Sequence, residues 1–166
     1  MMNNQTSGSM FLGVAIFWDW QNCRATEEQI QCLVGFAYLK GNIILKKVYS
    51  DWNLDKNRKL QNKLFCEGFK ASHVPSYKNK PNRTDEELIY DCEQEALEQP
   101  DIKTVILVSG DGDFKTLVRN LKIHGKNVIV VAQCEKNTSQ VLRKVANEFY
   151  FLSQIEQQFR NLQFAA

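Results

Sequence analysis

Two aspartates separated by one glycine, Asp111 and Asp113, are the residues of this chain best suited to carry chemistry. They follow the apolar run 104–108, which is too short for a helix and is typical of a strand covered on both faces. Ligands of parallel α/β sheets bind at the carboxyl ends of the strands, so we expect both carboxylates at a ligand-binding edge. Glycines at 110 and 112 let the backbone turn tightly there.

A second apolar run, 11–18, ends in the same way, at Asp19. With the common strand order 3-2-1-4-5, the first and fourth strands are neighbours, and Asp19 then faces Asp111 and Asp113. Buried like charges repel one another and are costly to remove from water. A divalent cation would compensate for this cost, so the sequence predicts an acidic metal site.

Oxygen ligands alone match a hard cation, and we expect Mg²⁺ or Mn²⁺. A site of this kind favours metal-assisted hydrolysis of a phosphodiester. Asn22 is a candidate for binding a phosphate or a water of the metal, and Ser109 for orienting a carboxylate. The candidate catalytic residues and metal ligands are Asp19, Asp85, Asp111 and Asp113.

Each acid also has a simpler interpretation. Asp111 or Asp113 could only cap the helix that follows. The spacing Thr84-x-x-Glu87 predicts a capped helix with Asp85 in its first turn, where an acid favours the helix dipole without binding a metal. Asp91 lies about 120° round this helix from Asp85, so it is the weaker metal ligand and could instead support the site from behind or lie at the surface.

Basic and aromatic residues near the expected site could hold a substrate. Lys78, Lys80, Arg83 and Lys115 can bind phosphates with salt-dependent affinity, although a solvated basic loop explains them equally well. Trp20 could offer a platform for base stacking, or pack over the edge of the sheet. The candidate substrate-binding residues are Asn22, Ser109, Lys80, Arg83, Lys115 and Trp20.

Strand and helix patterns alternate strictly along the chain. Strands are expected at 11–18, 42–50, 68–74, 104–108, 127–132 and 149–152, with helices at 26–40, 55–67, from 84, and at 114–123, 139–147 and 153–162. This alternation predicts an α/β fold, a three-layer, doubly wound, Rossmann-like parallel sheet. We expect a disordered segment at 1–10, one domain at 11–152, and an amphipathic helix at 153–166 packed on that domain.

The composition limits the possible classes of protein. A net charge of +2 on 166 residues does not by itself indicate nucleic-acid binding. Five widely spaced cysteines and two histidines form no zinc pattern, and reduced thiols in a cytoplasmic protein are expected. The polar start of the chain lacks a signal peptide, and Asp19 interrupts the first apolar run, so neither export nor a membrane span is expected.

Three segments together resemble the NYN domain, in its bacterial LabA-like branch of the PIN-like nuclease superfamily. They are 15–22 (AIFWDWQN), the spacing of Asp85 and Asp91, and 107–114 (LVSGDGDF), the most specific of the three. The resemblance covers roughly 11–152. It implies a PIN-like fold, Mg²⁺ or Mn²⁺, and RNA as substrate and partner.

By this resemblance Asp19 and Asn22 match the residues after the family's first strand. Asp85 and Asp91 match its helix acids, and the pair at 111 and 113 matches its fourth-strand acids. The chain departs from the family at Trp20, where a small residue is usual, and at 78–84, which lacks the common Lys-Gly-Val.

The expected function is that of a metal-dependent ribonuclease acting on RNA, with single-stranded RNA as the partner. The alternative is a catalytically weak or inactive module that regulates by binding RNA or protein, which the tryptophans flanking Asp19 favour. A haloacid-dehalogenase-like phosphatase needs a second acid where Gln21 stands, and a dinucleotide site needs a glycine where Lys115 stands. A homo-oligomer remains open.

Overall fold

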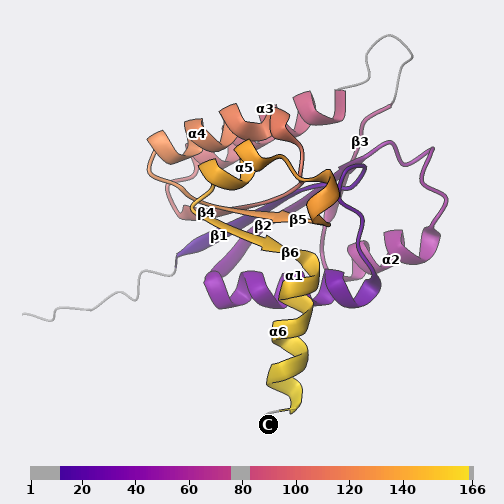
Figure 1. Cartoon of the computed structure of the whole chain (residues 1–166). Coiled ribbons are helices and arrows are strands. Elements are labelled where there is room, and N and C mark those ends of the chain that lie inside the picture. Colours follow the sequence, from indigo (N-terminus) through magenta and orange to yellow (C-terminus); the bar gives the residue numbers. More distant parts are fainter. Residues whose placement is uncertain (1–11, 76–82, 165–166) are drawn as a thin grey trace, which may run out of the picture.

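The computed structural model describes residues 12–75 and 83–164 and contains one six-stranded sheet (Figure 1). The strand order is β3-β2-β1-β4-β5-β6, and every neighbouring pair is parallel. The strands are β1 (Gly13–Asp19), β2 (Asn42–Ser50), β3 (Lys70–His73), β4 (Ile102–Val108), β5 (Asn127–Ala132) and β6 (Glu148–Phe151). The predicted doubly wound α/β fold is confirmed, and β1 and β4 are neighbours as expected.

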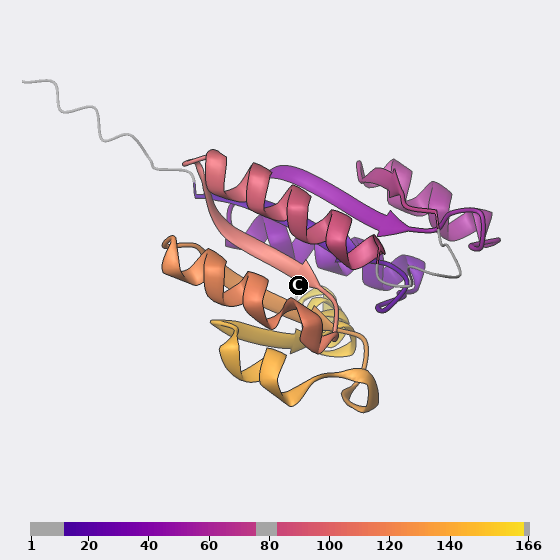
Figure 2. The same cartoon turned by 90° about the horizontal axis from the view of Figure 1, so that it is seen from above.

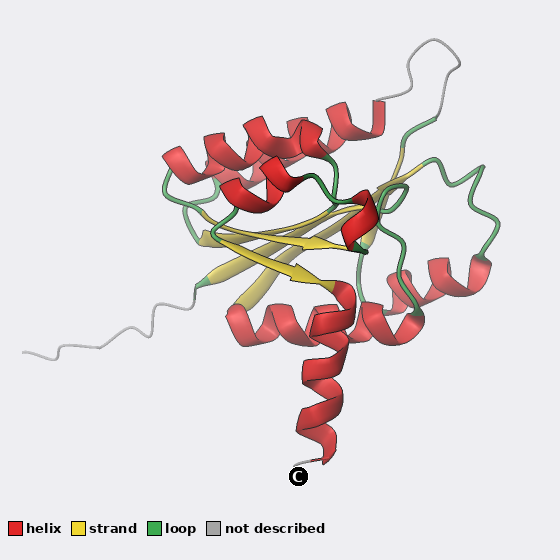
Figure 3. Ribbon diagram, in the orientation of Figure 1, coloured by secondary structure: helices red, strands yellow, loops and turns green. Residues whose placement is uncertain are grey.

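Helices cover both faces of the sheet, which gives three layers (Figure 3). One face carries α1 (Glu27–Lys40), α2 (Arg58–Cys66) and α6 (Leu152–Phe164). The other carries α3 (Arg83–Glu98), α4 (Lys115–Ile123) and α5 (Gln140–Val145), and α3 and α4 run side by side over the sheet in Figure 2. Short 3-10 turns are η1 (Gly112–Phe114) and η2 (Glu135–Asn137).

The central strand β1 is buried along its whole length because helices cover both of its faces. Val14, Ile16 and Trp18 point to the layer of α1, while Ala15 and Phe17 belong to the core under α3 and α4. This double burial explains the continuous apolar run in the sequence. It also fixes the place of Asp19, the last residue of the strand.

The observed start of α1 agrees with the start predicted from the sequence, whereas the cap predicted for α3 does not. Thr26 and Gln29 form a capping box at the start of α1, where a helix was expected from residue 26. The predicted Thr84 cap is wrong, since α3 already includes Arg83, and Thr84 is buried with its hydroxyl donating to Gln21 Oε1 at 3.2 Å. Asp85 nevertheless lies in the first turn of α3, as expected.

The carboxyl-terminal helix α6 packs against α1. Ile155 is fully buried, and the ring of Phe159 covers Gly35, where a Cβ atom would lie 2.7 Å from the ring. Arg160 donates two hydrogen bonds to the Glu28 carboxylate, both at 2.8 Å. Leu162 is 59% exposed, and the second half of α6 extends away from the sheet in Figure 1.

No helix in the described ranges 12–75 and 83–164 is both long enough and apolar enough to span a membrane. All five cysteines fall within these ranges, and none forms a disulfide. The segment 1–10, for which the sequence predicts disorder, lies outside the described residues.

Candidate metal centre

The predicted acids come from three elements that meet at one edge of the sheet. Asp19 ends β1, Asp111 and Asp113 follow the neighbouring strand β4, and Asp85 lies in the first turn of α3. This edge is the topological switch point of the sheet, where ligands of such folds bind.

Three of these acids form a compact group. One carboxylate oxygen from each of Asp85, Asp111 and Asp113 lies within 4.8 Å of the other two. Burial, together with the negative charges of Asp19, Asp111 and Asp113, raises the pKa of Asp85 to about 7. The group therefore concentrates negative charge at this edge of the sheet.

Asp19 lies deeper than these three acids. Its side chain is 2% exposed, Oδ1 accepts the backbone N–H of Asn22 at 3.2 Å, and Oδ2 accepts the Ser109 hydroxyl at 3.1 Å. Burial, with a smaller contribution from Asp111, raises its pKa to about 6, although these hydrogen bonds act in the opposite direction. Asp19 borders the same pocket but is not among the three clustered oxygens.

Asp19, Asp85 and Asp111 line a polar pocket of about 220 Å³. Gln21 and Thr84 also line it, and the sequence did not single them out for the site. In the sequence, only their positions next to Asn22 and Asp85 could have indicated that Gln21 and Thr84 belong to the site. The hydrogen bond from Thr84 to Gln21 holds the start of α3 against the loop after β1.

Asn22 and Ser109 join the two loops that carry the acids. Asn22 Oδ1 accepts the backbone N–H of Gly110 at 2.9 Å and the Ser109 hydroxyl at 3.2 Å. Ser109 has a single hydroxyl proton, which it shares between Asn22 and Asp19, and its oxygen accepts the backbone N–H of Asp111 at 3.2 Å. Ser109 thus orients a carboxylate, while a phosphate contact by Asn22 stays a prediction.

Asp111 also acts as a cap. Its Oδ1 accepts the backbone N–H of Asp113 at 3.0 Å and so begins η1. Gly110 lies so close to the loop after β5 that a Cβ atom there would meet the Asn137 carbonyl oxygen at 2.6 Å. Asp111 is therefore both a cap and a member of the acidic group, because the tight turn that it caps also brings it beside Asp85.

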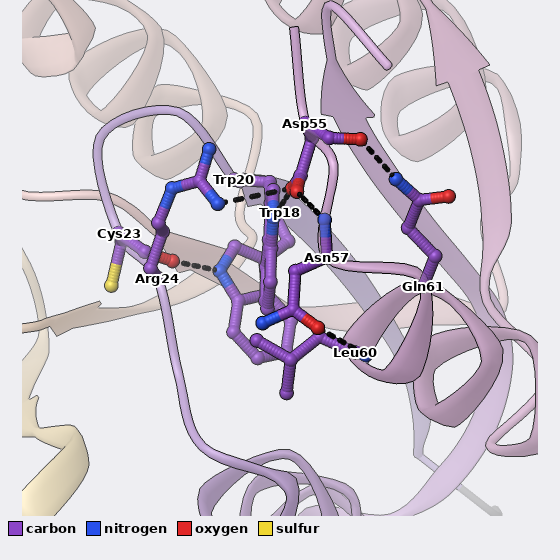
Figure 4. A network of polar contacts seen from close by, with 8 residues as sticks. All are labelled: Trp18, Trp20, Cys23, Arg24, Asp55, Asn57, Leu60 and Gln61. Carbon is purple, nitrogen blue, oxygen red and sulfur yellow. Dashed lines mark hydrogen bonds and ion pairs between the residues drawn. The ribbon is translucent and has the colours of Figure 1, made fainter. Parts of the chain in front are cut away.

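Trp20 is not available for base stacking. Its side chain is fully buried, and its indole N–H donates to Asp55 Oδ2 at 2.6 Å (Figure 4). The ring of Trp18 packs edge-on against it, with ring centres 5.3 Å apart. The stacking interpretation is wrong, and the ring packs under the edge of the sheet instead.

Asp91 faces away from the clustered acids. Its Oδ2 accepts hydrogen bonds from Lys47 Nζ and from the Tyr49 hydroxyl, both at 2.8 Å. Asp91 lies on a different side of α3 from Asp85 and points at β2. Its predicted role as a metal ligand is therefore wrong. Its place is an ion pair behind the site.

The predicted phosphate-binding residues are only partly described. Lys78 and Lys80 lie outside the described residues. Arg83 is half-buried at the first described residue of α3, and Lys115 is exposed at the start of α4, two residues after Asp113. Their contact with phosphates stays a prediction.

The donor set fits a hard divalent cation. Three carboxylates offer oxygen ligands that converge from two elements, and the raised pKa of Asp85 reflects burial and neighbouring negative charge, both of which a bound cation would offset. Neither histidine nor cysteine belongs to this group. Mg²⁺ or Mn²⁺ therefore suits these residues better than Zn²⁺.

Comparison with known proteins decides the family. The model of the NYN domain matches residues 13–153, which include all of the acids described above. The chain belongs to the NYN domain family. NYN domains are PIN-like domains, a superfamily of nucleases that typically depend on divalent metal ions, and the acidic group of this NYN domain agrees with that character.

A crystal structure of a protein of unknown function from Vibrio parahaemolyticus RIMD 2210633 is similar to this NYN domain. The two share 26% identity with a TM-score of 0.71, over 91% of this chain and 96% of the other. None of the curated proteins compared with the chain matches it.

Proposed function

We propose that this NYN domain, of the LabA-like branch, is a metal-dependent ribonuclease that hydrolyses RNA phosphodiester bonds with Mg²⁺ or Mn²⁺. The observation that carries the proposal is the convergence of Asp85, Asp111 and Asp113 beside a polar pocket that the first two of them line. Crowding so much negative charge together has no benefit for packing, because like charges destabilise one another.

In this proposal Asp85, Asp111 and Asp113 hold the cation. When bound, it supplies positive charge to stabilise a phosphodiester and lowers the pKa of water. Asp19 adds a fourth negative charge and keeps Ser109 in place, while Ser109 and Asn22 hold the two acid-bearing loops at a fixed separation. This preorganisation is what a phosphoryl-transfer site requires of its protein groups.

We infer that the substrate is single-stranded RNA. Lys115 is exposed two residues after Asp113, and Arg83 lies two residues before Asp85 at the first described residue of α3, so their nearness to the acids in the sequence supports them as candidates to bind phosphates. Binding through such residues is expected to weaken steeply with salt.

The test is cleavage of labelled single-stranded and structured RNAs in Mn²⁺, Mg²⁺ or EDTA. Wild type is compared with Asp111→Asn and with Asp101→Asn, an exposed aspartate before β4 that serves as a matched control. We expect metal-dependent cutting by wild type and the control, and its loss in Asp111→Asn. Cutting that survives in Asp111→Asn, or is absent from wild type with every metal, would reject the proposal.

A second candidate is a catalytically weak or inactive NYN module that regulates by binding RNA or protein. The observation in its favour is that Asp19 is held by two hydrogen bonds outside the group of three oxygens. RNA that is bound but never cut by wild type would support it.

A cytoplasmic location and a homo-oligomeric state are also proposals. Three of the five free cysteines are buried, and burial raises the pKa of the Cys23 and Cys92 thiols. This agrees with inert, reduced thiols. Light scattering on the purified protein would measure its oligomeric state.

A further inference from the structure

A two-part pocket lies beside α2 and the edge strand β3, apart from the acidic residues. Its apolar part has a volume of about 170 Å³ and is walled by Trp52, Phe65 and Phe69. Its polar part, of about 300 Å³, is lined by residues that include Lys56 and Arg58. Trp52 and Gln61 line both parts, so we treat them as one feature, the α2 pocket.

The apolar part presents an aromatic surface to solvent. Phe65 is 80% exposed, which is unusual for so large an apolar side chain, while Phe69, which lines the same part, is buried. Trp52 is half-buried, and its indole N–H donates to the Ser72 carbonyl at 2.8 Å, which fixes the plane of the ring. The aromatic surface therefore has one fixed ring, Trp52, and one exposed ring, Phe65.

The polar part is lined by the exposed cations Lys56 and Arg58 and by the carboxylate of Asp55, which is buried and paired with Arg24. Residues 56–70 contain five Lys and Arg against one acidic residue, whereas the rest of the chain contains sixteen basic and eighteen acidic residues. Lys59 pairs with Glu27 and Lys63 with Glu67. Lys56 and Arg58 are exposed and form no ion pair with any acid in the part of the chain that the structure describes. These two cations are therefore available to an anion.

Hydrogen bonds hold the walls of the α2 pocket in place (Figure 4). The Asp55 carbonyl accepts Gln61 Nε2 at 2.6 Å, and its Oδ1 accepts the backbone N–H of Asn57 at 2.9 Å. Its Oδ2 accepts the indole N–H of Trp20, the residue that follows Asp19. The loop that forms the α2 pocket is thus tied to the strand end that forms the acidic site.

We propose that the α2 pocket binds one nucleotide of a single-stranded RNA, away from the bond that is cut. Its base stacks against Phe65 and Trp52, and its phosphate pairs with Lys56 and Arg58. Aromatic surfaces beside cations are the common means of holding single strands without sequence preference. The inference rests on the proposed function, because it takes RNA as the ligand of this NYN domain.

The test is binding of a fluorescently labelled single-stranded RNA to the full chain in EDTA, where metal-dependent cleavage is absent. The variants are Phe65→Ser and the double variant Lys56→Ala/Arg58→Ala. The control, Lys103→Ala/Lys144→Ala, removes two exposed cations elsewhere. We expect about a tenfold loss of affinity in each pocket variant, with little change in the control.

The salt dependence separates the two halves of the pocket. Removing both cations is expected to reduce the slope of log affinity against log salt by roughly 0.7 for each phosphate that the protein no longer neutralises. Phe65→Ser should weaken binding with the slope unchanged. Circular dichroism checks that each variant is folded.

The outcomes distinguish this inference from the proposed function. If wild type cuts RNA but the pocket variants bind it like wild type, the α2 pocket inference is overturned and the nuclease stands. If wild type binds without cutting and the pocket variants lose affinity, the pocket is supported and the nuclease fails. If Phe65→Ser only dissociates an oligomer in light scattering, the surface joins protein chains and the inference is overturned.

Discussion

The side-chain oxygen of Asn22 accepts the backbone N–H of Gly110 at 2.9 Å. These residues are far apart in the sequence, and the bond joins the loop after β1 to the loop after β4. It sets the separation of Asp19 from Asp111, so the geometry of the acidic site depends on it.

Replacing Asn22 with alanine should damage both stability and the site. The buried N–H of Gly110 loses its acceptor, which costs about 1–3 kcal/mol of unfolding free energy. Urea denaturation measures this loss, and the exposed Asn62→Ala is the control. Equal stability of the two variants would show that Gly110 does not depend on Asn22.

The two glycines of the acidic motif should respond differently to alanine. A Cβ atom on Gly110 would meet a backbone oxygen, Asn137 O, at 2.6 Å, whereas one on Gly112 would meet the movable Ser139 hydroxyl at 2.8 Å. We expect Gly110→Ala to lower the melting temperature clearly more than Gly112→Ala, because a backbone contact cannot rotate away. The reverse order in a thermal melt would contradict the packing described for this turn.

Without metal, stability should fall as the pH rises from about 4 to about 7. The pKa of Asp85 is raised from 3.8 to about 7, and that of Asp19 to about 6, so over this range the folded chain holds protons that the unfolded chain has released. Raising the pH removes these protons and leaves repelling carboxylates. Melting curves in EDTA measure the fall.

Asp85→Asn is the matched variant for this pH experiment, since it removes the titrating group. Its melting temperature should change less than that of wild type between about pH 5 and about pH 7.5, which lie on either side of the raised pKa. A wild-type stability that rises across this range would show that the acids are not crowded as described.

The bond between Trp20 and Asp55 should contribute more than an ordinary indole hydrogen bond. Trp20→Phe removes one donor from a buried carboxylate and should cost about 1.5–3 kcal/mol. Trp52→Phe removes a bond to a backbone carbonyl and should cost about 1 kcal/mol. Urea denaturation compares the two, and a larger loss in Trp52→Phe would reverse the ranking.

Local patterns predicted most of the fold. The bounds of β2 and β5 agree with the sequence, because alternating or continuous apolar runs and flanking glycines mark them. The start of α1 agrees as well, since its capping box involves only residues three apart. The strict alternation of strands and helices predicted the parallel sheet, and the observed strand order contains the common order 3-2-1-4-5 that was assumed for such folds.

Long-range contacts explain what the sequence missed. The helix predicted from residue 55 begins at Arg58, because Asn57 caps it, while the carboxylate of Asp55 is engaged by Trp20, 35 residues away. Asp91 matched a family position, but Lys47 and Tyr49 of β2 hold it elsewhere. Residue types near the site were readable from the sequence, whereas the direction of each side chain depended on partners from other elements.

Mn²⁺ binding by the purified, metal-stripped chain tests the central claim most directly. Titration calorimetry at about pH 8, above the raised pKa of Asp85, compares wild type with Asp111→Asn and the control Asp101→Asn. The three clustered carboxylates predict that wild type and the control bind Mn²⁺ alike and that Asp111→Asn binds at least about tenfold more weakly. Equal binding by Asp111→Asn, or no binding by wild type, would contradict a cation site at these acids.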